Sequence, residues 1–269
     1  IRPTAPKSFL RLETLPGEFA QVDWAHCGTI LIGNRTWRLS CFLMVLSYSR
    51  MLYLEFTLSQ SMEAFLTGHV HAFEFFGGVP RKINYDNLRS VVLSRVGRDI
   101  RFHPRFMDFA GYYLFEPVPC KVRAGWEKGK VESAVKFVRS SFLAGRAITT
   151  LAELNEQARL WRDGQANSRI HGATRERPAD RFVEEKSKFQ PLPPKPYDTA
   201  FIDTVGVNSQ SLIHFDANRY TAPSTFAGKS LTLKADAAQV SLFDGPRPVA
   251  VHLRSYEKHR IIEDPAHHQ

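Results

Sequence analysis

The sequence predicts an α+β protein, in which a mixed sheet with flanking helices is followed by a helical connector and a small all-β barrel. Three apolar segments near the start have strand character, and helical periodicity then alternates with short strands. After a proline-rich stretch at residues 189–196, the pattern changes to short strands separated by turns. A chain of 269 residues with 43% hydrophobic residues can build two or three such units.

The first three strands are expected in the apolar segments, at residues 19–25 with a continuation through 29–32, at 37–47 and at 51–57. The second of these is almost continuously apolar, as in a strand that is buried on both faces. A helix follows, for which Ser61 is the expected N-cap and Gly77-Gly78 the expected stop. A fourth strand at residues 79–85 leads to Asp86.

The next segment, residues 87–101, is polar and basic and is expected to be a loop. A helix at 104–114, a strand at 115–119, a basic loop at 121–129 and a helix to about residue 142 are expected to follow. Strand-strand-strand-helix-strand-helix-strand-helix is the order of the ribonuclease-H-like fold, a mixed sheet with helices on its faces.

Two further helices are expected in the connector, one to about residue 162 that begins with a Thr150/Glu153 capping box, and one at 178–186. The barrel strands are expected at residues 211–215, 219–222, 230–235, 240–243 and 248–253. Five units are predicted. They are an extended basic arm (residues 1–17), a ribonuclease-H-like catalytic core (18–145), a helical connector with a Pro-rich linker (146–198), a β-barrel (199–258) and a tail (259–269).

The overall charge favours a polyanionic partner, because the net charge is +9 and the sequence pI is about 9.6. The three cysteines, Cys27, Cys41 and Cys120, are scattered, which argues against a zinc ribbon or a disulfide framework and favours a reducing cytoplasm. The longest apolar run is too short to span a bilayer, so no membrane association is expected. The chain begins without an initiator Met or a signal peptide, as expected of a fragment.

Three acidic residues are the candidate catalytic and metal-binding site: Asp23 in the first strand, Asp86 at the tip of the fourth, and Glu132 in the helix that follows the basic loop. A carboxylate in an apolar strand is costly to desolvate unless it is paired or binds a cation. Three such groups in a basic chain suggest a magnesium site that handles phosphates. The alternatives are a capped strand end for Asp23, an Asx-turn for Asp86 and a solvated helix face for Glu132.

Five motifs in this order resemble transposases of the IstA type, which have an aspartate-aspartate-glutamate (DDE) active site and a core like that of retroviral integrases. The motifs are residues 16–24 (Pro-Gly-Glu-Phe-Ala-Gln-Val-Asp-Trp), 84–88 (Asn-Tyr-Asp-Asn-Leu), 128–132 (Lys-Gly-Lys-Val-Glu), 167–172 (Asn-Ser-Arg-Ile-His-Gly) and 218–223 (Asn-Arg-Tyr-Thr-Ala-Pro). The resemblance implies that Asp23, Asp86 and Glu132 hold two Mg²⁺ ions, for which Mn²⁺ can substitute. It also implies a homo-multimer on DNA, a helper ATPase of the IstB AAA+ type, and a cytoplasmic, nucleoid-associated bacterial location.

Basic residues near the acids are the candidate DNA contacts. Lys128, Lys136 and Arg139 share the helix face of Glu132, Lys130 lies in the same helix, and Arg95 and Arg98 lie in the loop expected after Asp86. A solvated stripe would look the same. The barrel carries its own cations, which are expected to hold DNA or dock another protomer: Arg219, Lys229, Lys234, Arg247 and Arg254.

The predicted function is a DNA transposase, which cleaves at transposon ends and transfers the freed 3′-hydroxyl into target DNA. Two alternatives remain at the level of the sequence. One is a ribonuclease-H-like nuclease that uses the same acids only for hydrolysis. The other is a non-catalytic DNA-binding assembly module.

Overall fold

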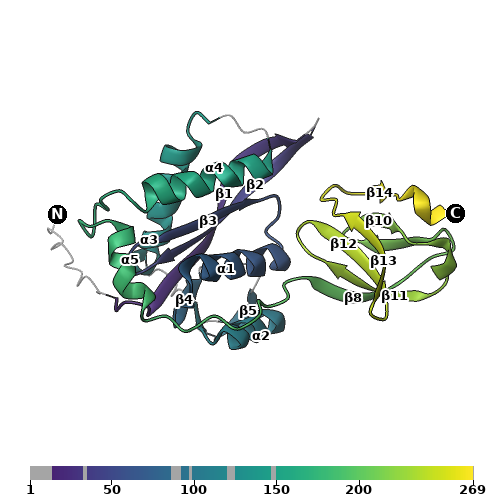
Figure 1. Ribbon diagram of the computed structural model, residues 1–269, viewed down its shortest axis with the longest axis horizontal. Coiled ribbons are helices and arrows are strands. Elements are labelled where there is room, and N and C mark those ends of the chain that lie inside the picture. The colour runs from purple at the N-terminus through teal and green to yellow at the C-terminus, as the bar shows by residue number, and fades with distance from the viewer. Residues whose placement is uncertain are drawn as a thin grey trace, which may run out of the picture.

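The computed structural model describes residues 14–32, 35–85, 92–96, 99–119, 125–146 and 150–268. They form a mixed sheet with helices on both faces, and a C-terminal region of strands joined to it by an extended segment (Figure 1). The predicted fold class is confirmed. Within these residues, no helix combines the length and the apolar character that a membrane span requires.

The N-terminal part is built on a five-stranded sheet with the order β3-β2-β1-β4-β7. Its strands are β1 (Phe19–Ile32), β2 (Arg35–Leu46), β3 (Leu52–Thr57), β4 (Lys82–Tyr85) and β7 (Glu116–Pro119). β1, β2 and β3 are antiparallel neighbours, whereas β4 pairs in parallel with both β1 and β7. β1 therefore occupies the centre, between an antiparallel half and a parallel half.

Helices cover both faces of this sheet (Figure 1). They are α1 (Met62–Phe76), α2 (Pro104–Tyr113), α3 (Gly125–Phe137), α4 (Leu151–Trp161) and α5 (Pro178–Lys186). Side chains of β1 alternate between two cores: Val22 packs in the cluster with α1 and α2, and Ala25 packs in the cluster with α3 and α4. The apolar run of β2 serves both cores, because Phe42 belongs to the first and Leu43 to the second.

The caps predicted for the first helix are confirmed. The Ser61 Oγ atom accepts a hydrogen bond from the Ala64 N–H at 3.3 Å, and Gly77 ends α1 in the left-handed conformation with φ 69°. His69 lies on the buried face of α1, whereas His71 is exposed and contacts Glu55. The two histidines therefore diverge, as expected from their spacing along a helix.

Buried His69 is held neutral within an aromatic cluster. Its Nδ1–H donates to the Phe65 carbonyl at 2.8 Å, and its Nε2 accepts from the Tyr85 hydroxyl at 2.9 Å. Burial lowers the pKa of His69 from 6.5 to about 3, because no counter-charge stabilises the imidazolium.

Acidification is expected to destabilise the fold through His69. Below pH 6.5 the unfolded chain binds a proton at this residue that the folded chain does not bind until about pH 3, so the stabilisation is present above 6.5 and is lost as the pH falls toward 3. The contribution is about 2 kcal/mol between pH 7 and pH 5. Urea unfolding across this range measures it, and His69→Gln should remove this part of the pH dependence. An equal slope in both proteins would contradict the assignment.

Two segments predicted to be loops contain regular structure. β5 (Val92–Val96) and β6 (Asp99–Phe102) form a hairpin that covers much of the segment at residues 87–101, where the high content of polar and basic residues favoured a loop. α3 begins at Gly125, inside the loop predicted at 121–129, and continues as a π-helical turn at Val138–Leu143. Gly129 disfavours a helix by about 1 kcal/mol, but packing of α3 on the sheet through Val131 overrides this local preference.

The outer edge of β3 is closed by two asparagines from the connector. Asn167 accepts from the Leu52 N–H at 2.9 Å and donates to the Leu52 carbonyl at 3.0 Å. Asn155 makes the same pair with Phe56, at 2.7 and 2.9 Å. Both side chains thus supply the hydrogen bonds that a neighbouring strand would make. The predicted division of the chain into domains stays a prediction. Helix α4, which was assigned to the connector, packs in the same hydrophobic core as the sheet.

The segment that leads to the C-terminal region is bound to α2. The Arg105 guanidinium pairs with Glu63 at 3.1 Å and donates to the carbonyls of Thr199 and Ala200 at 2.6 and 2.7 Å. The Tyr113 hydroxyl accepts from the Tyr197 N–H at 3.2 Å. These contacts fasten residues 197–200, which directly follow the Pro-rich stretch, to α2.

The C-terminal strands are paired in two sheets, β14-β10-β9 and β13-β12-β11-β8. They are β8 (Phe201–Gly206), β9 (Leu212–Phe215), β10 (Asn218–Thr221), β11 (Ser230–Ala235), β12 (Gln239–Asp244), β13 (Arg247–Leu253) and β14 (Ile261–Ile262). The all-β prediction is confirmed, and within residues 199–268 the pairing does not close into one barrel. The sequence missed β8, in which most side chains are exposed and the apolar alternation is weak.

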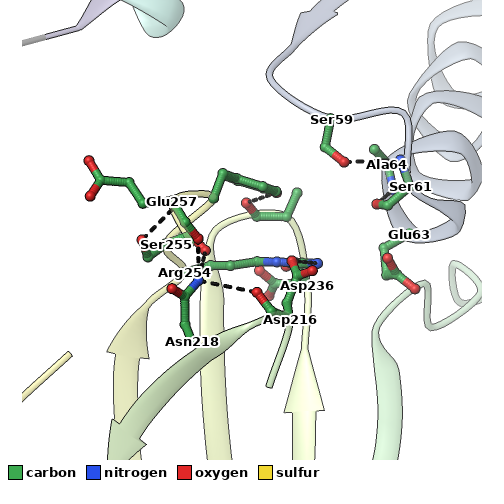
Figure 2. A network of polar contacts seen from close by, with 12 residues as sticks. Ser59, Ser61, Glu63, Ala64, Asp216, Asn218, Asp236, Arg254, Ser255 and Glu257 are labelled. Atoms are coloured by element: carbon green, nitrogen blue, oxygen red, sulfur yellow. Dashed lines mark hydrogen bonds and ion pairs between the residues drawn. The ribbon is translucent and has the colours of Figure 1, made fainter. Parts of the chain in front are cut away.

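The motif at residues 218–223 holds this region together. Buried Asn218 donates to the carbonyls of Ser255 and Glu257 at 3.0 and 2.6 Å (Figure 2). Thr221 is also buried, and its Oγ lies 3.0 Å from Nδ1 of His267, a residue to which the sequence assigned no role. The residues of this motif therefore have a structural role, which is to join segments of the C-terminal region by hydrogen bonds.

Two of the cations expected on the surface of this region have internal partners. The Arg254 side chain is 4% exposed and pairs with Asp216 at 3.3 Å (Figure 2). It also lies over the ring of Phe215. Lys234 pairs with Asp198 at 2.5 Å. The prediction that the cations of this region can contact DNA is wrong for Arg254, because its guanidinium is buried and its charge is neutralised by Asp216.

Candidate active site

Asp23 lies on the face of β1 that α3 covers. It pairs in register with Leu43, which belongs to the core beneath α3 and α4. Its side chain is partly buried, and Oδ1 accepts a hydrogen bond from the Trp24 N–H at 2.8 Å. This bond orients the carboxylate at the centre of the sheet.

Glu132 is brought next to the same strand by a contact between α3 and β1. The N–H of Val131 donates to Oε1 of Gln21 at 3.1 Å, and both residues are buried. Gln21 precedes Asp23 by two positions and therefore shares its face of the strand. Glu132 itself is exposed, so its carboxylate is accessible to solvent and to ligands.

Asp86, the remaining predicted acid, lies outside the described residues. Its preceding neighbour, Tyr85, ends β4 and pairs in parallel with Val22, which precedes Asp23. The two strands thus reach the same level of the sheet directly before the two aspartates.

The donor chemistry on this face fits a divalent cation. Asn84 pairs in register with Gln21, and its Oδ1 is buried without a hydrogen-bond partner among the described residues. Carboxylate and amide oxygens are the ligands that Mg²⁺ prefers, and a buried oxygen without a donor is otherwise costly. Among the described residues no three His, Cys, Asp or Glu side chains form a metal-binding group, and Asp86 is not in this set.

The predicted DNA contacts separate into different environments. Lys136 is exposed on α3, one turn after Glu132. Arg139 donates to the His26 carbonyl of β1 at 2.6 Å, so it also fastens the helix to the sheet. Lys130 lies on another side of α3, in a pocket with Arg50. For Lys128 and Arg95 only the backbone is described, in α3 and β5, and Arg98 lies outside the described residues.

The cysteines do not contribute to the acidic site. Cys41 is buried in the core, and burial raises the pKa of its thiol. Cys27 is half-buried, and its pKa is lowered by a hydrogen bond from Cys41 and by the charge of Arg139. Cys120 lies outside the described residues.

The order of the five-stranded sheet, with β4 parallel to both β1 and β7 and helices on both faces, is that of the ribonuclease-H-like fold. Residues 192–264 match the family described as Mu transposase, C-terminal domain. A Geobacillus stearothermophilus protein assigned as the transposase of insertion sequence element IS5376 is 36% identical over 87% of this chain and 58% of its own length. A transposase of Aminobacter aminovorans is 32% identical over 96% of this chain and 51% of its own length. The transposase of IS21 from Pseudomonas aeruginosa is 28% identical over 94% and 64%.

The homologues of the chain are thus transposases of the IS21 family, which confirms the predicted resemblance. The chain spans between half and two thirds of the length of these relatives, 51% to 64%. Among solved structures, the HTLV-2 integrase catalytic core domain in complex with magnesium aligns with a TM-score of 0.44 and 15% identity, over 64% of this chain and 99% of that chain. This degree of similarity says nothing about function. The fold class is assigned from the topology of the sheet.

Proposed function

We propose that this chain is the part of a DNA transposase that cleaves at transposon ends and transfers the 3′-hydroxyl into target DNA. Asp23, Asp86 and Glu132 are its catalytic acids. The observation that carries the proposal is the parallel register of β1 and β4 up to the two aspartates, together with the α3 contact that brings Glu132 to β1. The similarity to transposases over most of the chain supports the same activity.

The acids would hold two Mg²⁺ ions, or Mn²⁺ in their place, which would activate the attacking water or 3′-hydroxyl and stabilise the leaving oxygen. The chain itself keeps the carboxylates in place. The Trp24 N–H fixes Asp23, and the Gln21 side chain fixes the turn of α3 that carries Glu132. Repulsion among clustered carboxylates disfavours this arrangement in the absence of a counter-charge.

The same proposal includes DNA as the substrate, a homo-multimer that holds two transposon ends, and a helper ATPase of the IstB type. A cytoplasmic, nucleoid-associated location follows from this function.

Joining of two DNA molecules is the reaction that decides between the transposase and the alternatives. The assay uses pre-cleaved ends and a target duplex, with Mg²⁺ and with EDTA. Joined product only with Mg²⁺ is expected. Nicking of DNA without joining would indicate a nuclease, and Mg²⁺-independent binding without either reaction would indicate an assembly module.

Replacement of Lys136 is expected to weaken DNA binding at all sequences. Lys136→Gln removes an exposed charge next to Glu132, and the loss of one phosphate contact should reduce the slope of log K against log salt by about 0.9. Fluorescence anisotropy with a labelled duplex measures this. Lys195→Gln is the control, because Lys195 lies beside α2 on the opposite side of the sheet. An unchanged slope for Lys136→Gln would favour a solvated stripe.

A further inference from the structure

Two cysteine thiols meet between β1 and β2, on the face of the sheet that α3 covers. Cys41 pairs in register with Ala25, and Cys27 follows Ala25 by two positions, at the bulge that begins after His26. Alternate residues of a strand share one face, and both cysteines pack in the hydrophobic cluster beneath α3 and α4. Both are free thiols, and a hydrogen bond joins their side chains.

The two thiols differ in exposure and in the charges around them. Cys41 is fully buried, and burial raises its pKa, so this thiol stays protonated. Cys27 is only half-buried. The Arg139 guanidinium donates to the His26 carbonyl at 2.6 Å and also to the sulfur of Cys27. The hydrogen bond from Cys41 and the charge of Arg139 lower the pKa of Cys27 against the effect of burial.

This arrangement favours oxidation of Cys27. The thiolate is the reactive form of cysteine, and a neighbouring arginine stabilises it. Cysteines that respond to oxidants combine thiolate character and access with a second thiol nearby. Cys27 has the first two features, and Cys41 on the neighbouring strand supplies the third.

We propose that Cys27 is a site of reversible oxidation by hydrogen peroxide, and that Cys41 converts the product into a disulfide between β1 and β2. The Cys27 thiolate attacks a peroxide oxygen, so that an S–O bond forms, the O–O bond breaks, and the hydroxide that leaves takes a proton from solvent. The Cys41 sulfur then attacks the sulfenic acid of Cys27. An S–S bond forms, the S–O bond breaks, and the hydroxyl leaves with the Cys41 proton. The two sulfurs lose two electrons to the peroxide, which becomes two waters.

The thiol pair is close to the elements that carry two of the candidate acids. Asp23 lies on the same strand and the same face as Cys27. Arg139 follows Glu132 by about two turns along α3 and its π-helical continuation. The disulfide would remove the negative charge that Arg139 contacts, and the His26 carbonyl would be its remaining partner among the described residues. Oxidation would therefore weaken the attachment of this helix to β1.

The test is treatment of the full, reduced chain with hydrogen peroxide in EDTA, followed by mass spectrometry without reductant. A Cys120→Ser background removes the third thiol. The expected product is a single chain that has lost two hydrogens, with the peptides of Cys27 and Cys41 joined, and dithiothreitol should restore both thiols. Two free thiols after the treatment, or a disulfide between two chains, would overturn the proposal. Neither result depends on the proposed function, since the assay contains no DNA and no metal.

Cys41→Ser separates the two steps of the reaction. Serine keeps a hydrogen-bond donor at this position but cannot form a disulfide, so oxidation should stop at the sulfenic acid of Cys27, which dimedone traps as an adduct. Cys27→Ser should give neither the adduct nor the disulfide. Thermal melting shows whether each variant is folded. Absence of the adduct in folded Cys41→Ser would show that Cys27 is not the attacking thiol.

Replacement of Arg139 tests the origin of the reactivity. Iodoacetamide alkylates the thiolate, so Arg139→Gln should slow modification of Cys27 several-fold, and by about tenfold for each unit by which the pKa rises. Arg139→Lys keeps the charge and should retain most of the rate. Arg146→Gln is the matched control, because Arg146 is exposed after the π-helical turn and contacts Phe142 and Gln157. An unchanged rate in Arg139→Gln, or equal slowing in Arg146→Gln, would contradict the role of Arg139.

Discussion

Glu132→Gln is expected to abolish strand transfer, with a loss of at least about 10³-fold, while folding and DNA binding remain. Loss of one member of a catalytic unit has effects on this scale. The substitution removes the charge that would hold a metal ion but keeps the shape of an exposed side chain. Asp23→Asn is expected to have the same effect, because Asn can still accept the hydrogen bond from the Trp24 N–H.

The measurement is the rate of joining of pre-cleaved ends in Mg²⁺, with anisotropy and melting as checks on binding and folding. Glu74→Gln is the control, since Glu74 is an exposed glutamate on α1, on the opposite face of the sheet. Asp86→Asn should behave like the other two acids. Near-normal joining by any one of the three variants would show that its residue is not a metal ligand.

Asn167→Ala is expected to destabilise the fold by about 3 kcal/mol. The side chain is 2% exposed and makes both edge hydrogen bonds of Leu52, so its loss leaves a buried N–H and a buried carbonyl without partners. Each unsatisfied group costs about 1–3 kcal/mol. Asn155→Ala should cost less, because Asn155 is only partly buried and water can replace it.

Urea unfolding provides the free energies for these variants. Gln165→Ala is the control, because Gln165 is exposed in the same segment and its backbone carbonyl, which accepts from the Arg169 N–H, is kept by the substitution. It should change the free energy of unfolding by less than about 0.5 kcal/mol. If Asn167→Ala cost no more than the control, the edge of β3 would not depend on the connector.

The elements with strong local signals could be predicted from the sequence. The apolar run of β2 and the caps of α1 at Ser61 and Gly77 are local features, and the structure has them where they were expected. The hairpin of β5 and β6 and the start of α3 were missed. Their local patterns are weak, and tertiary packing decides them.

The candidate site also has a part that the sequence could predict and a part that only the fold shows. Asp23 and Glu132 could be proposed from an apolar strand and a resemblance, but their relation depends on the Val131–Gln21 hydrogen bond, whose partners are far apart in the sequence. From the sequence, Arg254 is expected to be a cation on the surface. Only the fold shows that it pairs with Asp216 and lies over the ring of Phe215.

By itself, the sequence determined the fold class, the order of most elements, the transposase resemblance and the three candidate acids, because each depends on residues close together in the chain or on motif order. The tertiary structure alone decided the β3 edge closure by Asn155 and Asn167, and the contact of Cys27 with Cys41 and Arg139. These features join segments separated by long stretches of chain. Such contacts form only when the cores bring the segments together, so no local pattern encodes them.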